Sequence, residues 1–167
     1  RDWDVPQQEH WERSYLEGIR LETAGDPQQA LSRYQEAMAI DDCYAELHFR
    51  VARCRLAVGD LEAARRAFAL ARDWDALQFR ADGRINEIIR EVSANRTRLV
   101  EVDKALAESE PCRDGIPGRE FFYEHVHLTP EGNYLVARAM AEQAVHVLGL
   151  EAAGDWVPEA ECFRLLG

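Results

Sequence analysis

Lysine is almost absent from this 167-residue chain, since Lys104 is the single lysine among 20 basic residues. The formal net charge of -11 argues against nucleic acid as a partner, because such a chain repels phosphate backbones. The sequence contains no secretory signal and no apolar run long enough to span a membrane. The charge places no restriction on a small neutral substrate.

The cysteines are too far apart for a zinc or redox motif. Cys43, Cys54, Cys112 and Cys162 lack the close pairs that zinc ribbons and redox sites need. Cys43 and Cys54 fall on consecutive expected helices, where buried packing is the favoured interpretation and a disulfide is the alternative. The hydrophobic content of 47% excludes general disorder, and the length allows one ordinary core, or a small array plus part of another domain.

The chain matches itself when it is shifted by 34 residues. The matched positions are Gly18 and Ala52, Gly25-Asp26 and Gly59-Asp60, Ala30 and Ala64, Tyr34 and Phe68, Ala37 and Ala71, and Asp41 and Asp75. A constant period of this length is typical of stacked helix pairs.

Each unit is expected to form two antiparallel helices joined by a Gly-Asp turn. Gly25 can adopt the positive φ that ends a helix, and Asp26 with Pro27 supplies the cap and first-turn proline of the next helix. The missing side chain at Gly18 allows the two backbones to approach closely, and Tyr34 fills the space beyond the contact.

The pattern resembles the tetratricopeptide repeat family over residues 11–77. The resemblance implies two units, residues 11–44 and 45–78, after a lead-in of residues 1–10. It also implies a groove for a protein or peptide along the first helix of each unit. The implied groove residues are Glu12, Tyr15, Ile19, Glu22, Phe49, Arg53 and Leu56. Coincidental amphipathic helices and a purely architectural role are the alternatives.

A different order of elements is expected after the second unit. Residues 84–94 predict an amphipathic helix that can cap the second repeat, residues 99–102 a short β-strand, and residues 110–123 a turn-rich loop. The apolar side of the capping helix consists of Ile85, Ile88, Ile89 and Val92. This order of elements, a helix, a strand, a loop and a final helix, fits the end of a parallel α/β sheet better than it fits a third repeat.

The final helix has clear signals at both ends. Thr129 is expected as its cap, Pro130 in its first turn, and Gly149 at its end. Its expected buried stripe consists of Val136, Met140, Ala144 and Val147. The fold class is therefore mainly α: two helix-turn-helix hairpins and a capping helix, then a strand, a loop and a helix.

The loop before that helix carries the candidate chemistry. Residues 124–133 read Glu-His-Val-His-Leu-Thr-Pro-Glu-Gly-Asn and resemble the last signature block of SGNH (GDSL-type) hydrolases. The resemblance extends over residues 79–147 and implies that His127 is the general base and Glu124 its orienting acid, where the family usually has Asp. It implies ester hydrolysis or acyl transfer by a serine nucleophile, which needs no cofactor.

The nucleophile itself is missing from this piece. None of Ser14, Ser32, Ser93 and Ser109 lies in a Gly-Asp-Ser block, so we expect the chain alone to lack esterase activity. The chain begins without Met at Arg1, and we expect a longer protein whose missing hydrolase half is a further partner. Residues 79–148 would be the capping helix and hydrolase-like segment, and residues 149–167 a tail.

Three other interpretations of this loop stay open. Glu124, His125 and His127 could form a three-ligand metal site, although the hydrolase block explains the adjoining Leu-Thr-Pro-Glu-Gly better and we assign no metal. His127 could instead only pack near the helix start. The whole chain could also be a binding module in which residues 124–127 are structural.

Overall fold

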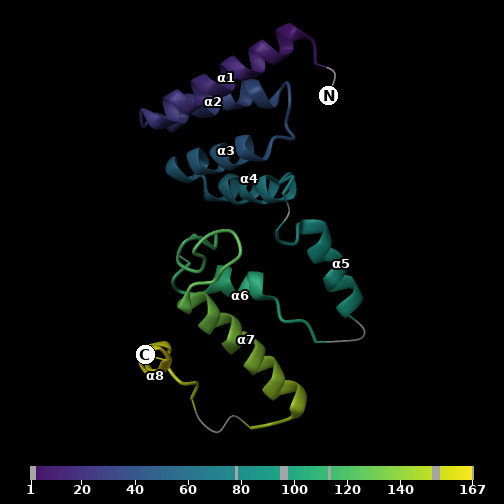
Figure 1. Cartoon of the computed structure of the whole chain (residues 1–167), viewed down its shortest axis with the longest axis vertical. Helices are drawn as coiled ribbons and strands as arrows, with labels where there is room; N and C mark the ends of the chain where they lie inside the picture. Colours follow the sequence, from purple (N-terminus) through teal and green to yellow (C-terminus); the bar gives the residue numbers. More distant parts are fainter. Residues whose placement is uncertain (1–2, 78, 95–97, 113, 152–154, 167) are drawn as a thin grey trace. The chain divides into compact units, whose positions relative to one another are not determined.

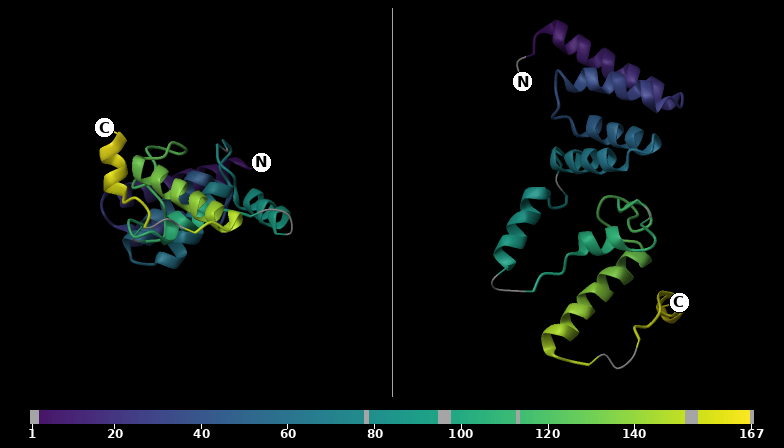
Figure 2. Two further views of the ribbon diagram at one scale, coloured as in Figure 1. Left: turned by 90° about the horizontal axis from the view of Figure 1, so that it is seen from below. Right: turned by 180° about the vertical axis from the view of Figure 1, so that it is seen from behind.

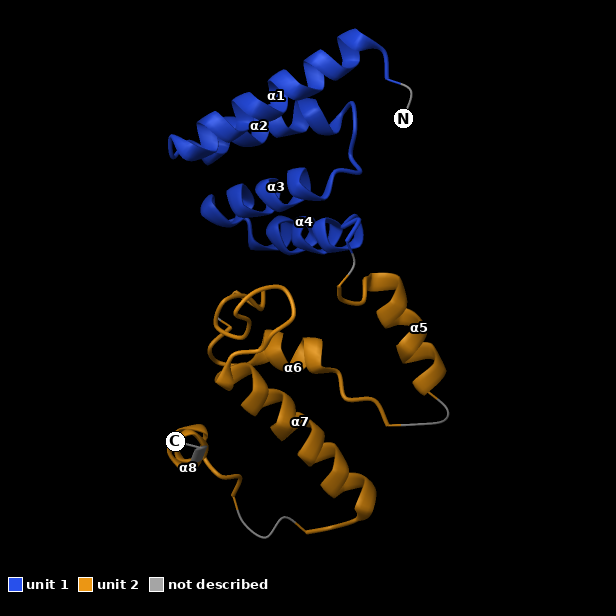
Figure 3. Cartoon of the chain, viewed as in Figure 1, with its two compact units in different colours: residues 1–78 blue, residues 79–167 orange. Residues whose placement is uncertain are grey.

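The computed structural model describes residues 3–77, 79–94, 98–112, 114–151 and 155–166 (Figure 1). Eight helices and no strand lie in these residues. The chain divides into two compact units, residues 1–78 and residues 79–167, which are coloured separately in Figure 3.

Unit 1 consists of two helical hairpins. The first contains α1 (Val5–Thr23) and α2 (Pro27–Met38), and the second contains α3 (Ala45–Ala57) and α4 (Leu61–Asp73). The views of the chain from the front and from behind (Figures 1 and 2) show these four helices side by side in chain order. The predicted two helical hairpins are present, but α1 begins at Val5, inside the expected lead-in of residues 1–10, because Asp4 caps it by accepting from the Gln7 N–H.

The Gly-Asp turns have the geometry that the sequence predicts. Gly25 and Gly59 have φ values of 81° and 82°, which glycine adopts without strain. The Asp26 carboxylate accepts from the Gln29 backbone N–H at 3.0 Å, and the Asp60 carboxylate caps α4 in the same way. The two turns therefore repeat one local device, 34 residues apart.

The same aromatic contact holds each hairpin together. Tyr15 and Tyr34 have ring centroids 6.2 Å apart, and the equivalent pair Phe49 and Phe68 has centroids 5.6 Å apart. Tyr34 is completely buried against Gly18. The repeated pair shows that the sequence period is also a packing period.

The cysteine predictions are partly confirmed. All four cysteines are free thiols. Cys54 is 1% exposed in the core, and this burial raises the pKa of its thiol to about 11. Cys43 is half-buried in the segment between α2 and α3, so its expected place on a helix is wrong.

Unit 2 contains α5 (Gly83–Ser93), α6 (Val102–Glu108), α7 (Pro130–Leu148) and α8 (Glu159–Leu166). The predicted strand at residues 99–102 is wrong, since the described part of the chain offers no partner strand and Val102 begins α6. A strand needs such a partner, whereas Lys, Ala, Leu and Glu in α6 favour a helix.

The ends of α7 match the sequence signals, but its expected buried stripe does not. The Thr129 hydroxyl accepts from the Gly132 N–H at 3.1 Å, and Gly149 ends the helix with a φ of 62°. Met140 and Val147 are each 56% exposed, and Ala144 is also exposed, because the small core of unit 2 reaches only the start of α7. The expectation that these residues are buried is therefore wrong.

The small core of unit 2 joins α6, the loop that follows it and the first turns of α7. Its buried members are Leu106, Cys112 and Phe121. The Phe121 carbonyl lies so close to Gly132 that a Cβ there would be 2.5 Å from the oxygen. This contact fixes the loop against the start of α7.

Helix α5 forms close to its predicted bounds, and its apolar side is exposed in unit 2. Ile85, Ile88 and Ile89 are 42 to 47% exposed. Arg90 connects α5 to the start of α6 through ion pairs with Glu101 at 2.8 Å and Asp103 at 2.7 Å. The role of α5 as a cap of the second repeat stays a prediction.

Among the described residues, no helix combines the length and apolar character needed to cross a membrane.

We expect Gly18→Ala to destabilise unit 1 by about 1–3 kcal/mol, because overpacking a buried contact outweighs the better helix propensity of alanine. The added Cβ would lie 2.3 Å from a carbon of the buried Tyr34 ring. Urea unfolding measures the change, and Ser32→Ala on the exposed side of α2 is the control, with an expected change within about 0.5 kcal/mol. Equal stability of Gly18→Ala and wild type would contradict the close approach.

Candidate functional site

The predicted groove residues of unit 1 lie on α1 and α3 and differ in accessibility. Glu12 is exposed, and Tyr15 and Ile19 are half-buried. On α3, Phe49 is 42% exposed and Leu56 is 37% exposed. Arg53 also projects to solvent. These six residues can contact a ligand in the folded protein.

Glu22, the remaining groove residue, is engaged inside the unit. Its carboxylate accepts from the Tyr34 hydroxyl at 2.7 Å and from the Arg50 guanidinium at 3.1 Å. It also lies 3.4 Å from the Arg53 guanidinium. Its side chain is 12% exposed, so this carboxylate joins α1, α2 and α3 beneath the groove surface.

Arg50 is the main groove residue that the sequence analysis missed. Its guanidinium pairs with Glu22 and with Glu46 at 3.0 Å, and its Nε donates to the Tyr15 hydroxyl at 3.3 Å. The spacing of Glu46 and Arg50 by one helical turn was a signal for the local pair. The contacts with α1 bridge two repeats and carry no short-range signal.

The buried hydroxyl of this network stays protonated. Burial and the hydrogen bond to the Glu22 carboxylate raise the pKa of Tyr34 above its ordinary value. Tyr34 therefore donates to Glu22 throughout the neutral and mildly alkaline range.

Four aromatic residues of unit 1 lie close to one another and are called here the aromatic cluster. They are Trp3, Trp11, Tyr15 and Tyr44. Trp11 stacks on Tyr15 with centroids 4.9 Å apart, and the Tyr44 ring stands edge-on to Trp11 at 5.3 Å and to Tyr15 at 5.7 Å. Trp3 lies 6.0 Å from Trp11.

The second candidate site is the loop before α7. The Tyr123 N–H donates to the His127 carbonyl at 2.9 Å, which closes a tight turn around residues 124–126. Glu124 uses one carboxylate oxygen to contact His127 Nδ1 and to accept from the His127 N–H at 3.0 Å. The other oxygen lies 2.8 Å from His125 Nδ1. The His127 side chain is 79% exposed.

Local hydrogen bonds control the ionisation of Glu124. Partial desolvation acts to raise its pKa, but hydrogen bonds from the His127 ring, the His127 backbone and the Val126 backbone outweigh it, and the pKa is lowered. The ionised carboxylate can therefore hold the His127 ring by Nδ1 and leave the Nε2 edge toward solvent.

Among the described residues, one group of three side chains could hold a metal ion. It consists of Asp41, Asp42 and Cys43, whose donor atoms lie within 4.8 Å of one another. Glu124, His125 and His127 do not form such a group in this part of the chain. The three-ligand alternative for the α7 loop therefore lacks geometric support.

The paired helices of unit 1 define a helical-repeat fold. Residues 21–82 match a family model described as Tetratricopeptide repeat, and this match extends from the last turn of α1 through α4. No curated protein and no solved structure matches the chain. A tetratricopeptide repeat is thus present and supports a protein-interaction role, whereas no comparison supports the hydrolase-like segment.

Arg50→Met and Glu22→Gln are each expected to destabilise unit 1 by about 1–3 kcal/mol, because each leaves a partly buried polar group without its partner. The double variant should lose less stability than the sum of the two single losses, with a coupling energy of about 1 kcal/mol or more between the two side chains. Chemical denaturation of all four proteins measures this cycle.

The exposed pair Glu17 and Arg20 provides the matched control for that cycle, and its coupling should be within about 0.5 kcal/mol. If the stability losses of Arg50→Met and Glu22→Gln simply add in the double variant, the two side chains do not act together.

The pKa of the Glu124 carboxyl is expected to lie below its ordinary value, and His127→Gln should raise it. Because the folded pKa is the lower one, the interaction stabilises the loop above the unfolded pKa and is lost as the pH falls through the folded pKa. Carbon-detected NMR of the carboxyl measures both values. His125→Gln should have a smaller effect, and an unchanged pKa in His127→Gln would rule out the ring contact.

Proposed function

We propose that unit 1 binds a peptide segment of a partner protein along α1 and α3. The observation that carries this proposal is the exposed row of Phe49, Arg53 and Leu56 on α3, which side-chain contacts of Arg50 and Arg53 with Glu22 join to α1. Apolar and charged groups in successive helical turns suit an extended or helical ligand.

The network beneath this surface favours binding by a preformed groove. Glu22 and Arg50 hold the two first helices together, so the exposed residues are presented on a fixed base. A preformed surface loses less conformational entropy on binding than one that must order itself. Ordering of the ligand is then the main entropic cost.

A selection of peptides from a random library on the whole chain tests this proposal. The combined change Arg53→Ala and Leu56→Ser should weaken selected peptides about tenfold or more, because it removes two long side chains that offer contact area to the ligand. Calorimetric titration measures the affinities.

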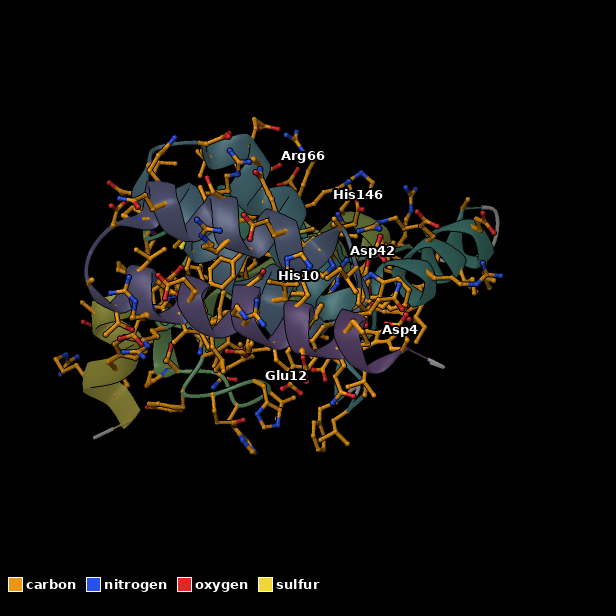
Figure 4. The ribbon with its side chains drawn as sticks, turned by 90° about the horizontal axis from the view of Figure 1, so that it is seen from above. Asp4, His10, Glu12, Asp42, Arg66 and His146 are labelled. Carbon is orange, nitrogen blue, oxygen red and sulfur yellow. The ribbon has the colours of Figure 1, made fainter. Side chains whose placement is uncertain are left out.

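Arg66→Ala is the matched control, since Arg66 is a well-exposed arginine on α4 (Figure 4). This change should keep the dissociation constant of each selected peptide within about twofold of the wild-type value. If every selected peptide binds the groove variant as tightly as wild type, the groove is not the binding site.

A second function is proposed for Glu124 and His127, on the strength of their side-chain contact and the exposed His127 ring. In ester hydrolysis His127 Nε2 would take the proton of a serine hydroxyl as that oxygen attacks the ester carbonyl. The proton would then pass to the leaving alcohol, water would release the acyl group from the serine in a second step, and Glu124 would stabilise the imidazolium formed in each step.

The serine for this reaction would come from outside the described residues. Ser14 donates to Glu36 at 3.1 Å on the helices of unit 1, and Ser109 donates to the Leu106 carbonyl at 2.7 Å. The Ser109 hydroxyl, which belongs to the same unit as His127, is therefore engaged by its own helix. The hydrolase role therefore requires a longer protein.

Hydrolysis of a nitrophenyl ester by the full-length protein tests the hydrolase role. His127→Ala should lower kcat about a thousandfold or more, as loss of a triad base does, whereas His125→Ala should retain most of the activity. The present chain alone should show no turnover. Full activity of His127→Ala would eliminate the base assignment.

A further inference from the structure

The aromatic cluster is a partly exposed, preformed set of rings in unit 1, the unit that carries the proposed groove. Tyr44 is 44% exposed, and Trp3, Trp11 and Tyr15 are half-buried. Aromatic faces carry a negative quadrupole and attract cations, and a surface of several rings presents this charge without further reorganisation.

Exposed carboxylates lie next to members of this cluster in the sequence, since Glu12 follows Trp11 and Asp42 precedes Tyr44 by two residues. Figure 4, which looks onto α1, labels Asp4 just before that helix and Glu12 on it. Glu12 accepts a hydrogen bond from the neutral Gln8 amide at 3.1 Å and Asp42 accepts one from the Cys43 thiol at 3.4 Å, and no cation pairs with either carboxylate among the described residues. Their charge is therefore available to a cationic ligand.

The protein already holds one of its own cations in this environment. The Arg50 guanidinium lies 6.0 Å from the Tyr15 ring centroid, donates to the Tyr15 hydroxyl, and pairs with Glu46. An aromatic ring flanked by carboxylates is thus a combination that binds a guanidinium in this fold.

We propose that the aromatic cluster, together with Glu12 and Asp42, binds an arginine or lysine side chain of the peptide partner. The inference rests on the proposed function of unit 1 and adds the chemical class of its ligand. The ligand would be a basic segment whose cation lies against the exposed Tyr44 ring while the neighbouring carboxylates compensate its charge. The acidic net charge of -11 favours the same class of partner.

Two capped peptides of equal length test this proposal on the whole chain. One alternates arginine with serine, and the other has glutamine in place of every arginine. Tryptophan fluorescence and calorimetry at low salt should detect binding of the arginine peptide alone, and binding should weaken as salt increases because exposed charges are screened.

Tyr44→Ala should weaken the arginine peptide about three- to tenfold, the range of one cation–π contact. Glu12→Gln and Asp42→Asn should each weaken it about two- to fivefold. The two carboxylate variants change exposed residues, so they keep the test valid if Tyr44→Ala fails to fold. The controls are Tyr123→Ala, whose ring is 70% exposed in unit 2, and Glu91→Gln on α5, and both should bind as wild type does.

Equal binding of the arginine and glutamine peptides would overturn the inference. An equal loss of affinity for the arginine peptide in Tyr44→Ala and Tyr123→Ala would also overturn it, because the peptide would then not bind at the aromatic cluster. Library peptides that depend on Arg53 and Leu56 but contain no arginine or lysine would refute the cationic ligand and leave the groove intact. Failure of the groove variants to affect any peptide would instead refute the proposed function itself.

Discussion

The fold of unit 1 depends on the contact between the Tyr34 ring and the bare backbone at Gly18. The ring is fully buried and sets the separation of α1 and α2. Its hydroxyl holds the Glu22 carboxylate, which in turn binds Arg50 on α3. One aromatic side chain therefore connects packing within the first repeat to the contact between repeats, and a disturbance at Gly18 is expected to reach the groove.

This connection explains how a short array can offer a definite binding surface. The charged groups nearest the core neutralise one another, and the outer residues Arg53, Leu56 and Glu12 remain accessible above them. Unit 2 is organised differently, because its small core fixes only the α7 loop and the first turns of α7. That core presents His127 on the surface with its ring held by Glu124. Each unit thus uses a few buried contacts to position exposed polar groups.

Local signals predicted the parts of the fold that depend on local physics. Gly25 with Asp26 specifies a turn through backbone freedom and capping, and Thr129 specifies the start of α7 in the same way. The strand at residues 99–102 could not be judged locally, because a strand forms only where a partner exists, and Val102 joins a helix instead. The contact of Glu22 with Arg50 spans 28 residues of sequence, so periodicity revealed the helices but not the ion pair between them. The contact between Glu124 and His127 was expected only from a family resemblance, and its catalytic role remains a prediction.

The most direct measurement of the central claim is NMR mapping of a selected peptide on the isotope-labelled chain. The account predicts that the largest shift changes occur in α1 and α3, at Glu12, Ile19, Arg53 and Leu56, with little change on the outer sides of α2 and α4. Shift changes concentrated on α2, on α4 or in unit 2 would contradict it.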